Sequence, residues 1–158
     1  MRAFIALELP ADFADDVAAM ARRLSASLDG RFLDRSTYHL TLAFLGDIDD
    51  AEASRALDAA CAGSTSVSLA SDSLGKFGRP ADATLWLGIA SDPALATLAE
   101  RVREELAARD IPFDPKPFRP HITLGRRVHI SKKPLPPLAF PLPAQVQTVT
   151  LFKSTLSR

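Results

Sequence analysis

Apolar and polar residues recur with two different periods along the chain. Apolar runs and alternating patterns predict strands at residues 4–9, 38–45, 67–74, 83–89, 121–124 and 146–153. Apolar residues at helical spacing predict three helices: one capped by Asp12, one over about residues 51–62, and one that begins at Pro93. Residues 76–80 have the composition of a turn. This order of elements predicts an α+β fold with largely antiparallel β-sheets.

Two segments in opposite halves of the chain share the pattern His-x-Thr-Leu. His39-Leu40-Thr41-Leu42 and His121-Ile122-Thr123-Leu124 each lie in a predicted strand, and the two histidines are 82 residues apart, about half the chain. A repeated pattern at this separation indicates an internal duplication with one histidine in each half.

Strand geometry places the chemistry of each motif on one face. Successive side chains of a strand point to opposite sides, so each histidine shares a face with the threonine two residues later. The leucine or isoleucine between them then points to the core. Two such strands facing each other across a cleft would put two imidazoles and two hydroxyls around one site.

That set of groups suits phosphodiester chemistry. Opening a cyclic phosphate requires one group that takes a proton from water and another that gives a proton to the departing oxygen. Two histidines, whose ordinary pKa is about 6.5, can supply both groups near neutral pH. This predicts a bell-shaped dependence of the rate on pH. Threonine hydroxyls can donate to the non-bridging phosphoryl oxygens. No paired cysteines, His-x-x-x-His or His-x-x-Glu spacing supports zinc, so no metal or other cofactor is predicted.

Arg126 is a candidate for a bidentate contact with the phosphate. It follows His121 by five residues, so strict alternation would put it on the opposite face. This role therefore requires a β-bulge or the end of the strand at Gly125. The equivalent position after His39 is Phe44. The two halves thus differ at the position of this cationic side chain, and this asymmetry would distinguish the roles of the two histidines.

The charge composition predicts that any contact with nucleic acid is confined to one part of the surface. The chain has 158 residues, 47% of them hydrophobic, which is enough for one compact domain over residues 1–158. Its 19 basic and 19 acidic residues give zero formal charge, so a protein that coats polyanions is excluded. Six basic residues and no acidic one lie between Lys116 and Lys133. Elsewhere such a run would indicate a solvated loop, but around a histidine motif it favours an anion site.

Cys61 and His129 are expected to have no catalytic role, and the N-terminal sequence favours a cytoplasmic protein. Cys61 is the only cysteine and lies in a helical pattern without a nearby histidine, so we expect a small apolar residue rather than a nucleophile. His129 lies outside both motifs and is expected on the surface. The N-terminal residues are interrupted too soon by charge for a signal peptide or membrane span.

At these residues the sequence resembles the 2H phosphoesterase superfamily, which is named for two His-x-Thr motifs. The likeness is to its RNA 2′,3′-cyclic phosphodiesterase branch, formerly called 2′,5′ RNA ligases, and it runs over almost the whole chain. Phe32 stands where that branch commonly has tryptophan. The segments that carry the resemblance are Met1-Arg2-Ala3-Phe4-Ile5-Ala6, His39-Leu40-Thr41-Leu42-Ala43-Phe44-Leu45-Gly46, Leu85-Trp86-Leu87-Gly88, Pro117-Phe118-Arg119-Pro120-His121-Ile122-Thr123-Leu124-Gly125-Arg126 and Leu151-Phe152-Lys153-Ser154.

The resemblance implies a bilobal fold with pseudo-twofold symmetry and a central cleft. It also implies hydrolysis of a 2′,3′-cyclic phosphate to a 2′-phosphomonoester without metal. His39 would give a proton to the leaving 3′ oxygen, and His121 would take one from water. Around these two catalytic residues we predict five residues that bind substrate: Thr41, Thr123, Arg126, Phe44 and Arg119.

Two other functions remain open at this stage. The same acid and base would serve the reverse reaction, a reversible 2′,5′ joining of RNA. The protein could instead be a module that holds an RNA end without turning it over. RNA ends and small cyclic nucleotides look alike at the phosphate, so both are predicted ligands, while no membrane contact and no obligate protein partner is predicted.

Overall fold

The computed structural model describes residues 2–154, which form three α-helices, one short 3-10 helix and nine strands. The helices are α1 (Ala11–Ser25), α2 (Asp50–Cys61) and α3 (Pro93–Ala108), with η1 (Arg35–Thr37) as the 3-10 turn. The strands are β1 (Arg2–Glu8), β2 (Arg31–Phe32), β3 (His39–Gly46), β4 (Val67–Leu69), β5 (Ser71–Arg79), β6 (Asp82–Ile89), β7 (His121–Val128), β8 (Ala144–Val146) and β9 (Val149–Ser154).

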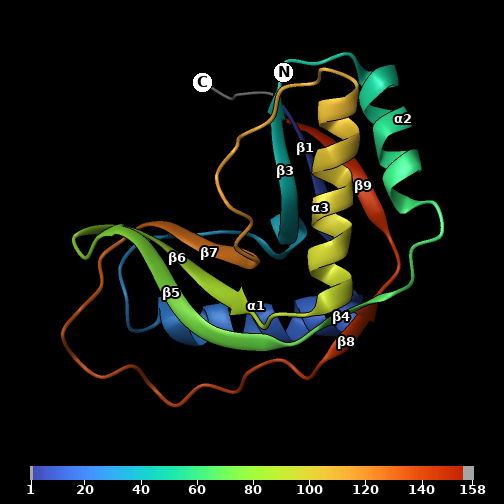
Figure 1. The fold of residues 1–158 in the computed structure, drawn as a ribbon. Coiled ribbons are helices and arrows are strands. Elements are labelled where there is room, and N and C mark those ends of the chain that lie inside the picture. Colours follow the sequence, from blue (N-terminus) through green and yellow to red (C-terminus); the bar gives the residue numbers. More distant parts are fainter. Residues whose placement is uncertain (1, 155–158) are drawn as a thin grey trace.

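Two antiparallel sheets make up most of the fold (Figure 1). One has the strand order β3-β1-β9 and the other β2-β7-β6-β5, while β4 and β8 form a small third ladder. In Figure 1 the first sheet stands upright beside α3, and the second lies crosswise to it. The predicted α+β fold with antiparallel sheets is therefore confirmed. Each of the two larger sheets carries one histidine motif, on β3 and on β7.

α2 and α3 begin where an aspartate side chain accepts from one of their first N–H groups. The carboxylate of Asp92 accepts from the Leu95 N–H at 3.0 Å, and that of Asp49 accepts from the Ala51 N–H at 2.9 Å. Pro93 occupies the first helical position, where it has no N–H to lose. α2 and α3 pack against each other beside the upright sheet (Figure 1). Within residues 2–154, none of the helices is both long and apolar enough to cross a membrane.

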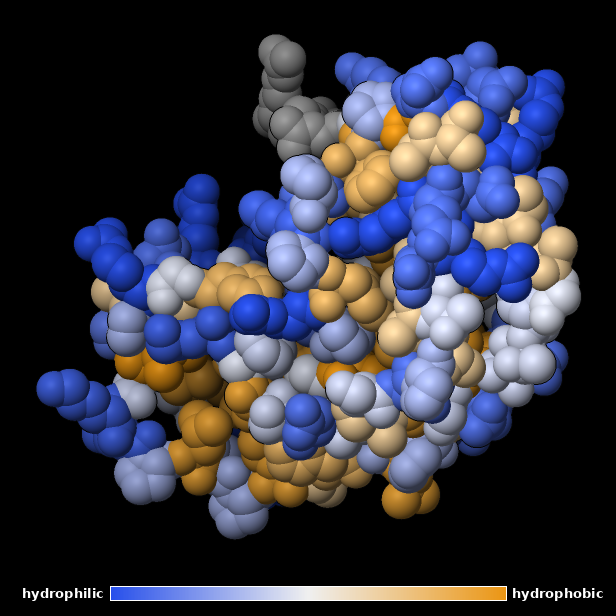
Figure 2. All heavy atoms as spheres, in the orientation of Figure 1, coloured by the Kyte–Doolittle hydropathy of each residue, from blue (hydrophilic) through white to orange (hydrophobic). Residues whose placement is uncertain are grey.

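A continuous apolar core holds the two motif strands in place. Leu40 and Leu42 of β3 and Ile122 and Leu124 of β7 are each at most 1% exposed, as the alternating pattern predicts. No polar or charged residue is buried in the described part of the chain. Figure 2 shows the outer surface in the same orientation, with hydrophilic residues gathered over α2 and hydrophobic residues more frequent lower down, around the crosswise sheet. The motif strands are thus anchored through their apolar faces.

Several predicted boundaries are wrong, for identifiable reasons. The strands predicted at residues 67–74 and 146–153 are each divided in two, because the chain passes from one sheet to another within them. Residues 76–79 are not a turn, since β5 continues to Arg79 and pairs there with β6, and the turn lies at Pro80 and Ala81. Asp12 does not cap α1, because that helix already begins at Ala11 after Pro10. The two-residue strand β2 was missed because so short a segment has no period.

Candidate active site

The two histidine motifs meet at one cavity. β3 and β7 lie side by side where the upright and crosswise sheets join (Figure 1). A cavity of about 1020 Å³ opens there, which is large enough for a nucleotide. Six of the seven predicted site residues line it: His39, Thr41, Phe44, His121, Thr123 and Arg126.

Matching β-bulges bring three side chains of each motif to this cavity. Leu42 of β3 and Leu124 of β7 are each an extra residue in the pairing with the neighbouring strand. Each bulge shifts the alternation by one residue, so the side chain five positions after the histidine also faces the cavity: Phe44 in β3 and Arg126 in β7. The pattern of buried and accessible residues is the same over the first six positions of both strands. The structure thus contains the bulge that a phosphate contact by Arg126 requires.

A backbone carbonyl determines the tautomer of His121. Nδ1 of the ring lies 2.6 Å from the carbonyl oxygen of Arg119, two residues earlier in the chain. Because a carbonyl oxygen can only accept, Nδ1 carries the proton, and in the neutral ring Nε2 has the free lone pair. The rings of Phe77 and Trp86 lie beside the imidazole, with centroid distances of 5.4 and 5.8 Å. His121 is therefore held with its basic nitrogen free to take a proton.

His39 is held in a similar way but in more apolar surroundings. The backbone of Thr37, again two residues earlier, forms a hydrogen bond with its ring. The imidazole stacks with Phe4 at a centroid distance of 4.7 Å and with Phe152 at 5.6 Å. Burial lowers the pKa of His39, the Thr37 bond opposes this change, and the positive charge of Arg126 adds a smaller lowering. In the free protein the neutral form of His39 is therefore favoured.

The groups that can hold a phosphoryl group are available. Within residues 2–154, the hydroxyls of Thr41 and Thr123 form no hydrogen bond and Arg126 forms no ion pair. Two neutral donors and one guanidinium are suited to the oxygens of an anionic phosphate. In the same part of the chain, no three His, Cys, Asp or Glu side chains gather as they would around a metal ion.

Comparison with known proteins identifies the family. The model of the 2′-5′ RNA ligase superfamily matches residues 9–157, a span that includes both motifs. The chain belongs to this superfamily. The resemblance seen in the two motifs is thereby confirmed.

Several curated relatives of this superfamily member carry the name RNA 2′,3′-cyclic phosphodiesterase. The protein from Geobacillus stearothermophilus is 35% identical over 129 residues, which cover 78% of the chain but only 41% of that relative. The protein from Escherichia coli is 31% identical over 160 residues, covering 99% of the chain and 89% of the relative. The crystal structure of Escherichia coli LigT with 3′-AMP has a TM-score of 0.79 at 29% identity, covering 99% of the chain and 90% of LigT.

Arg119 is the predicted site residue that does not line the central cavity. Its side chain is exposed, with the guanidinium carbon 5.9 Å from the ring centre of Phe77, and it lines a second, adjoining cavity. Arg119 of this superfamily member contributes to the central site through its backbone carbonyl, which accepts a hydrogen bond from His121. Substrate binding by the Arg119 side chain remains a prediction, and its place is the adjoining cavity.

Sequence reasoning missed the aromatic residues that hold the two imidazoles. Phe4, Trp86 and Phe152 lie in segments that carried the family resemblance, but their local patterns are those of ordinary strand residues. They reach the histidines because strands distant in sequence are neighbours: Phe4 pairs with Phe152 across β1 and β9. Phe77 falls in the segment that was mistaken for a turn. Only the strand pairing, and not the residue types, could have revealed these contacts.

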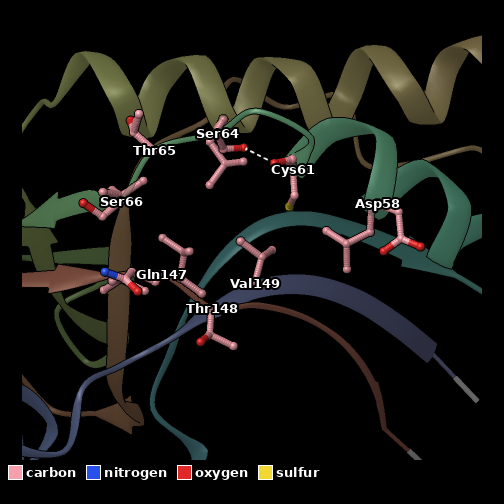
Figure 3. A pocket seen from close by; sticks show the side chains of 13 residues that line it. Asp58, Cys61, Ser64, Thr65, Ser66, Gln147, Thr148 and Val149 are labelled. Carbon is pink, nitrogen blue, oxygen red and sulfur yellow. Dashed lines mark hydrogen bonds between the residues drawn. The ribbon is translucent and has the colours of Figure 1, made fainter.

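A separate cavity of about 420 Å³ lies between the end of α2 and the segment joining β8 to β9 (Figure 3). Asp58, Cys61, Ser64 and Gln147 are among its lining residues, and no histidine, lysine or arginine lines it in the part of the chain that the structure describes. Burial raises the pKa of the half-buried Cys61 thiol, and the charge of Asp58 raises it further. A thiol with a raised pKa is a poor nucleophile, so Cys61 is an apolar residue of the helix, as its sequence pattern indicates.

Proposed function

We propose that this protein hydrolyses RNA 2′,3′-cyclic phosphate ends to 2′-phosphomonoesters, by acid and base catalysis between two histidines and without a metal. The observation that carries the proposal is that His39 and His121 line one cavity together with Thr41, Thr123 and Arg126. The names of the Geobacillus and Escherichia coli relatives support the substrate class, since both are RNA 2′,3′-cyclic phosphodiesterases.

The geometry of His121 suits the general base. With Nδ1–H donated to the Arg119 carbonyl, the neutral ring can accept a proton only at Nε2. Water attacks phosphorus and loses a proton to this nitrogen while the bond from phosphorus to the 3′ oxygen breaks. The proton on Nδ1 stays in place during this step. The carbonyl of Arg119, which accepts from Nδ1, therefore orients the ring and stabilises the imidazolium that forms.

His39 then gives a proton to the departing 3′ oxygen. This step requires the imidazolium form, whereas burial and Arg126 favour the neutral form in the free protein. A phosphodiester anion bound between the threonines and Arg126 would oppose the charge of the guanidinium and raise the pKa of His39. Substrate binding thus prepares the acid for its role. The hydroxyls and the guanidinium meanwhile hold the non-bridging oxygens, where charge develops in the transition state.

One experiment tests the function directly. The protein is incubated in EDTA with an oligoribonucleotide that ends in a 2′,3′-cyclic phosphate, and the product is identified by its sensitivity to phosphomonoesterase and by mass. The expected product is a 2′-phosphate in the presence of EDTA. A cyclic end that persists despite tight binding would identify a binding module, and a reaction abolished by EDTA would identify a metal enzyme. A 2′,5′ linkage formed with an added 5′-hydroxyl RNA would identify a ligase.

A further inference from the structure

A second cavity opens from the side of the central one. It has a volume of about 550 Å³ and shares four lining residues with the central cavity: Thr41, Phe44, Asp114 and His121. The other side of it is formed by the segment before β7, residues 116–120, and by Phe77 of β5. A substrate whose phosphoryl group lies beside His121 and whose chain extends in this direction would enter the second cavity.

The second cavity is preformed rather than closed by a loose loop. Residues 112–120 contain four prolines, which restrict the backbone. The Asp114 N–H donates to the Phe44 carbonyl at 2.9 Å, which ties this segment to β3. Arg103 of α3 donates to the carbonyl of Lys116 at 2.7 Å and places its guanidinium 5.6 Å from the ring centre of Phe113. A site held in this way loses little conformational entropy when it binds a ligand.

The charge of this cavity suits a nucleic-acid strand. Three basic side chains line it, Arg103, Lys116 and Arg119, against one acid, Asp114. The carboxylate of Asp114 accepts the Lys116 backbone N–H at 3.0 Å and lies 3.9 Å from the Lys116 ammonium, and the three cations outweigh this one anion. The Lys116 side chain is 86% exposed, which leaves its ammonium available to a phosphate.

The cavity also offers surfaces on which a base can stack. Phe77 is 38% exposed, and the guanidinium of Arg119 lies 5.9 Å from its ring centre. Phe118, which is half-buried, also lines the cavity. Aromatic rings and guanidinium planes beside basic side chains are the usual elements of single-strand binding, in which cations hold the backbone and flat groups hold the bases.

We propose that the second cavity binds the nucleotide that precedes the cyclic end, so that the protein prefers an oligoribonucleotide to a cyclic mononucleotide. This inference rests on the proposed function, because it places the reactive phosphate between the two histidines. Lys116 and Arg119 contact the phosphodiester that links the last two nucleotides, and the preceding base lies against Phe77 and Arg119. The central cavity, at about 1020 Å³, holds the terminal nucleoside and its cyclic phosphate.

The test compares two substrates that differ by one nucleotide. The value of kcat/KM is measured for cytidine 2′,3′-cyclic phosphate and for the dinucleotide CpC ending in a 2′,3′-cyclic phosphate. For the wild-type protein we expect the ratio of dinucleotide to mononucleotide to be at least about tenfold, the size of one charge-assisted contact. The double variant Lys116→Gln/Arg119→Gln should reduce this ratio about tenfold, and Arg119→Lys should restore part of it.

A matched control lies in the same basic run. Lys132 and Lys133 are exposed and line neither cavity, so Lys132→Gln/Lys133→Gln removes the same formal charge without touching the site. The ratio should keep its wild-type value in this control. Equal use of both substrates by the wild-type protein, or an equal loss of the ratio in test and control variants, would overturn the inference. Failure of the wild-type protein to hydrolyse either substrate would instead overturn the proposed function, and the inference with it.

Discussion

Replacement of Gly75 by alanine tests whether the indole of Trp86 positions the second histidine. Gly75 and Trp86 lie opposite each other on β5 and β6. A methyl group on Gly75 would lie 2.1, 2.3 and 2.6 Å from Cη2, Cζ2 and Cζ3 of the indole. These atoms belong to a rigid ring rather than to a flexible chain end, so the whole ring must move. Because the ring centroids of Trp86 and His121 are 5.8 Å apart, this movement also disturbs the imidazole.

Two effects of opposite sign determine the size of the change. Alanine is more favourable than glycine within a strand by about 0.5–1 kcal/mol, since it loses less backbone entropy. Forcing extra volume into a packed site costs about 1–3 kcal/mol. With three ring atoms inside contact distance the packing cost is larger, so Gly75→Ala should lower the free energy of unfolding by about 1–2 kcal/mol. With Trp86→Phe the smaller ring leaves room, and the same change should be neutral or stabilising.

Urea unfolding of the four proteins in this double-mutant cycle measures the coupling energy between the two positions, which should reach about 1–3 kcal/mol. The activity of each variant on a cyclic-phosphate substrate is measured in parallel. Gly75→Ala should lower kcat, because His121 loses a neighbouring ring that fixes its orientation. An equal cost of Gly75→Ala in both backgrounds would show that Gly75 and Trp86 are not coupled. Full activity of Gly75→Ala despite lowered stability would show that Trp86 does not hold His121.

The other predictions concern the histidines and the phosphate ligand. His39→Ala and His121→Ala should each reduce kcat by about 10²- to 10⁴-fold while the fold is retained by circular dichroism; near-normal turnover would remove that residue from its role. Because burial holds the pKa of His39 below its unfolded value near about 6.5, the unfolded chain binds this proton more tightly, and the free energy of unfolding should fall as the pH drops below that value. Urea unfolding at neutral and mildly acidic pH should show a smaller fall for His39→Gln than for the wild type. NMR titration should also show the pKa of His39 rising when inorganic phosphate is added; no change would mean that phosphate does not bind beside it. Arg126→Lys should lower kcat/KM by about 10- to 100-fold through loss of the bidentate contact, whereas the neighbouring control Arg127→Lys should not.

The sequence predicted those parts of the molecule that depend on local pattern. The repeated His-x-Thr strands, the α3 helix with Pro93 at its first position, and the apolar faces of β3 and β7 all follow from period and residue type. The sequence showed only that a phosphate contact by Arg126 requires a bulge or the end of the strand. It could not locate the bulges, because an extra residue in a strand is defined by the pairing with the partner strand. The same reason hid the role of Phe4 and Phe77, which become neighbours of the histidines only through strand pairing.

The two halves of the site share a backbone plan but differ in the surroundings of each imidazole, and the proposed mechanism gives this difference a role. Each histidine ring bonds to the backbone two residues earlier, and each strand bulges at the fourth residue of its motif. His39, however, stacks with Phe4 and Phe152, and the position equivalent to Arg126 on its strand is Phe44. The guanidinium from the His121 strand therefore opposes protonation of His39 until an anion is bound. In the mechanism that we propose, a bound phosphate would reverse this effect, so His39 would become an effective acid only when there is a substrate to receive its proton.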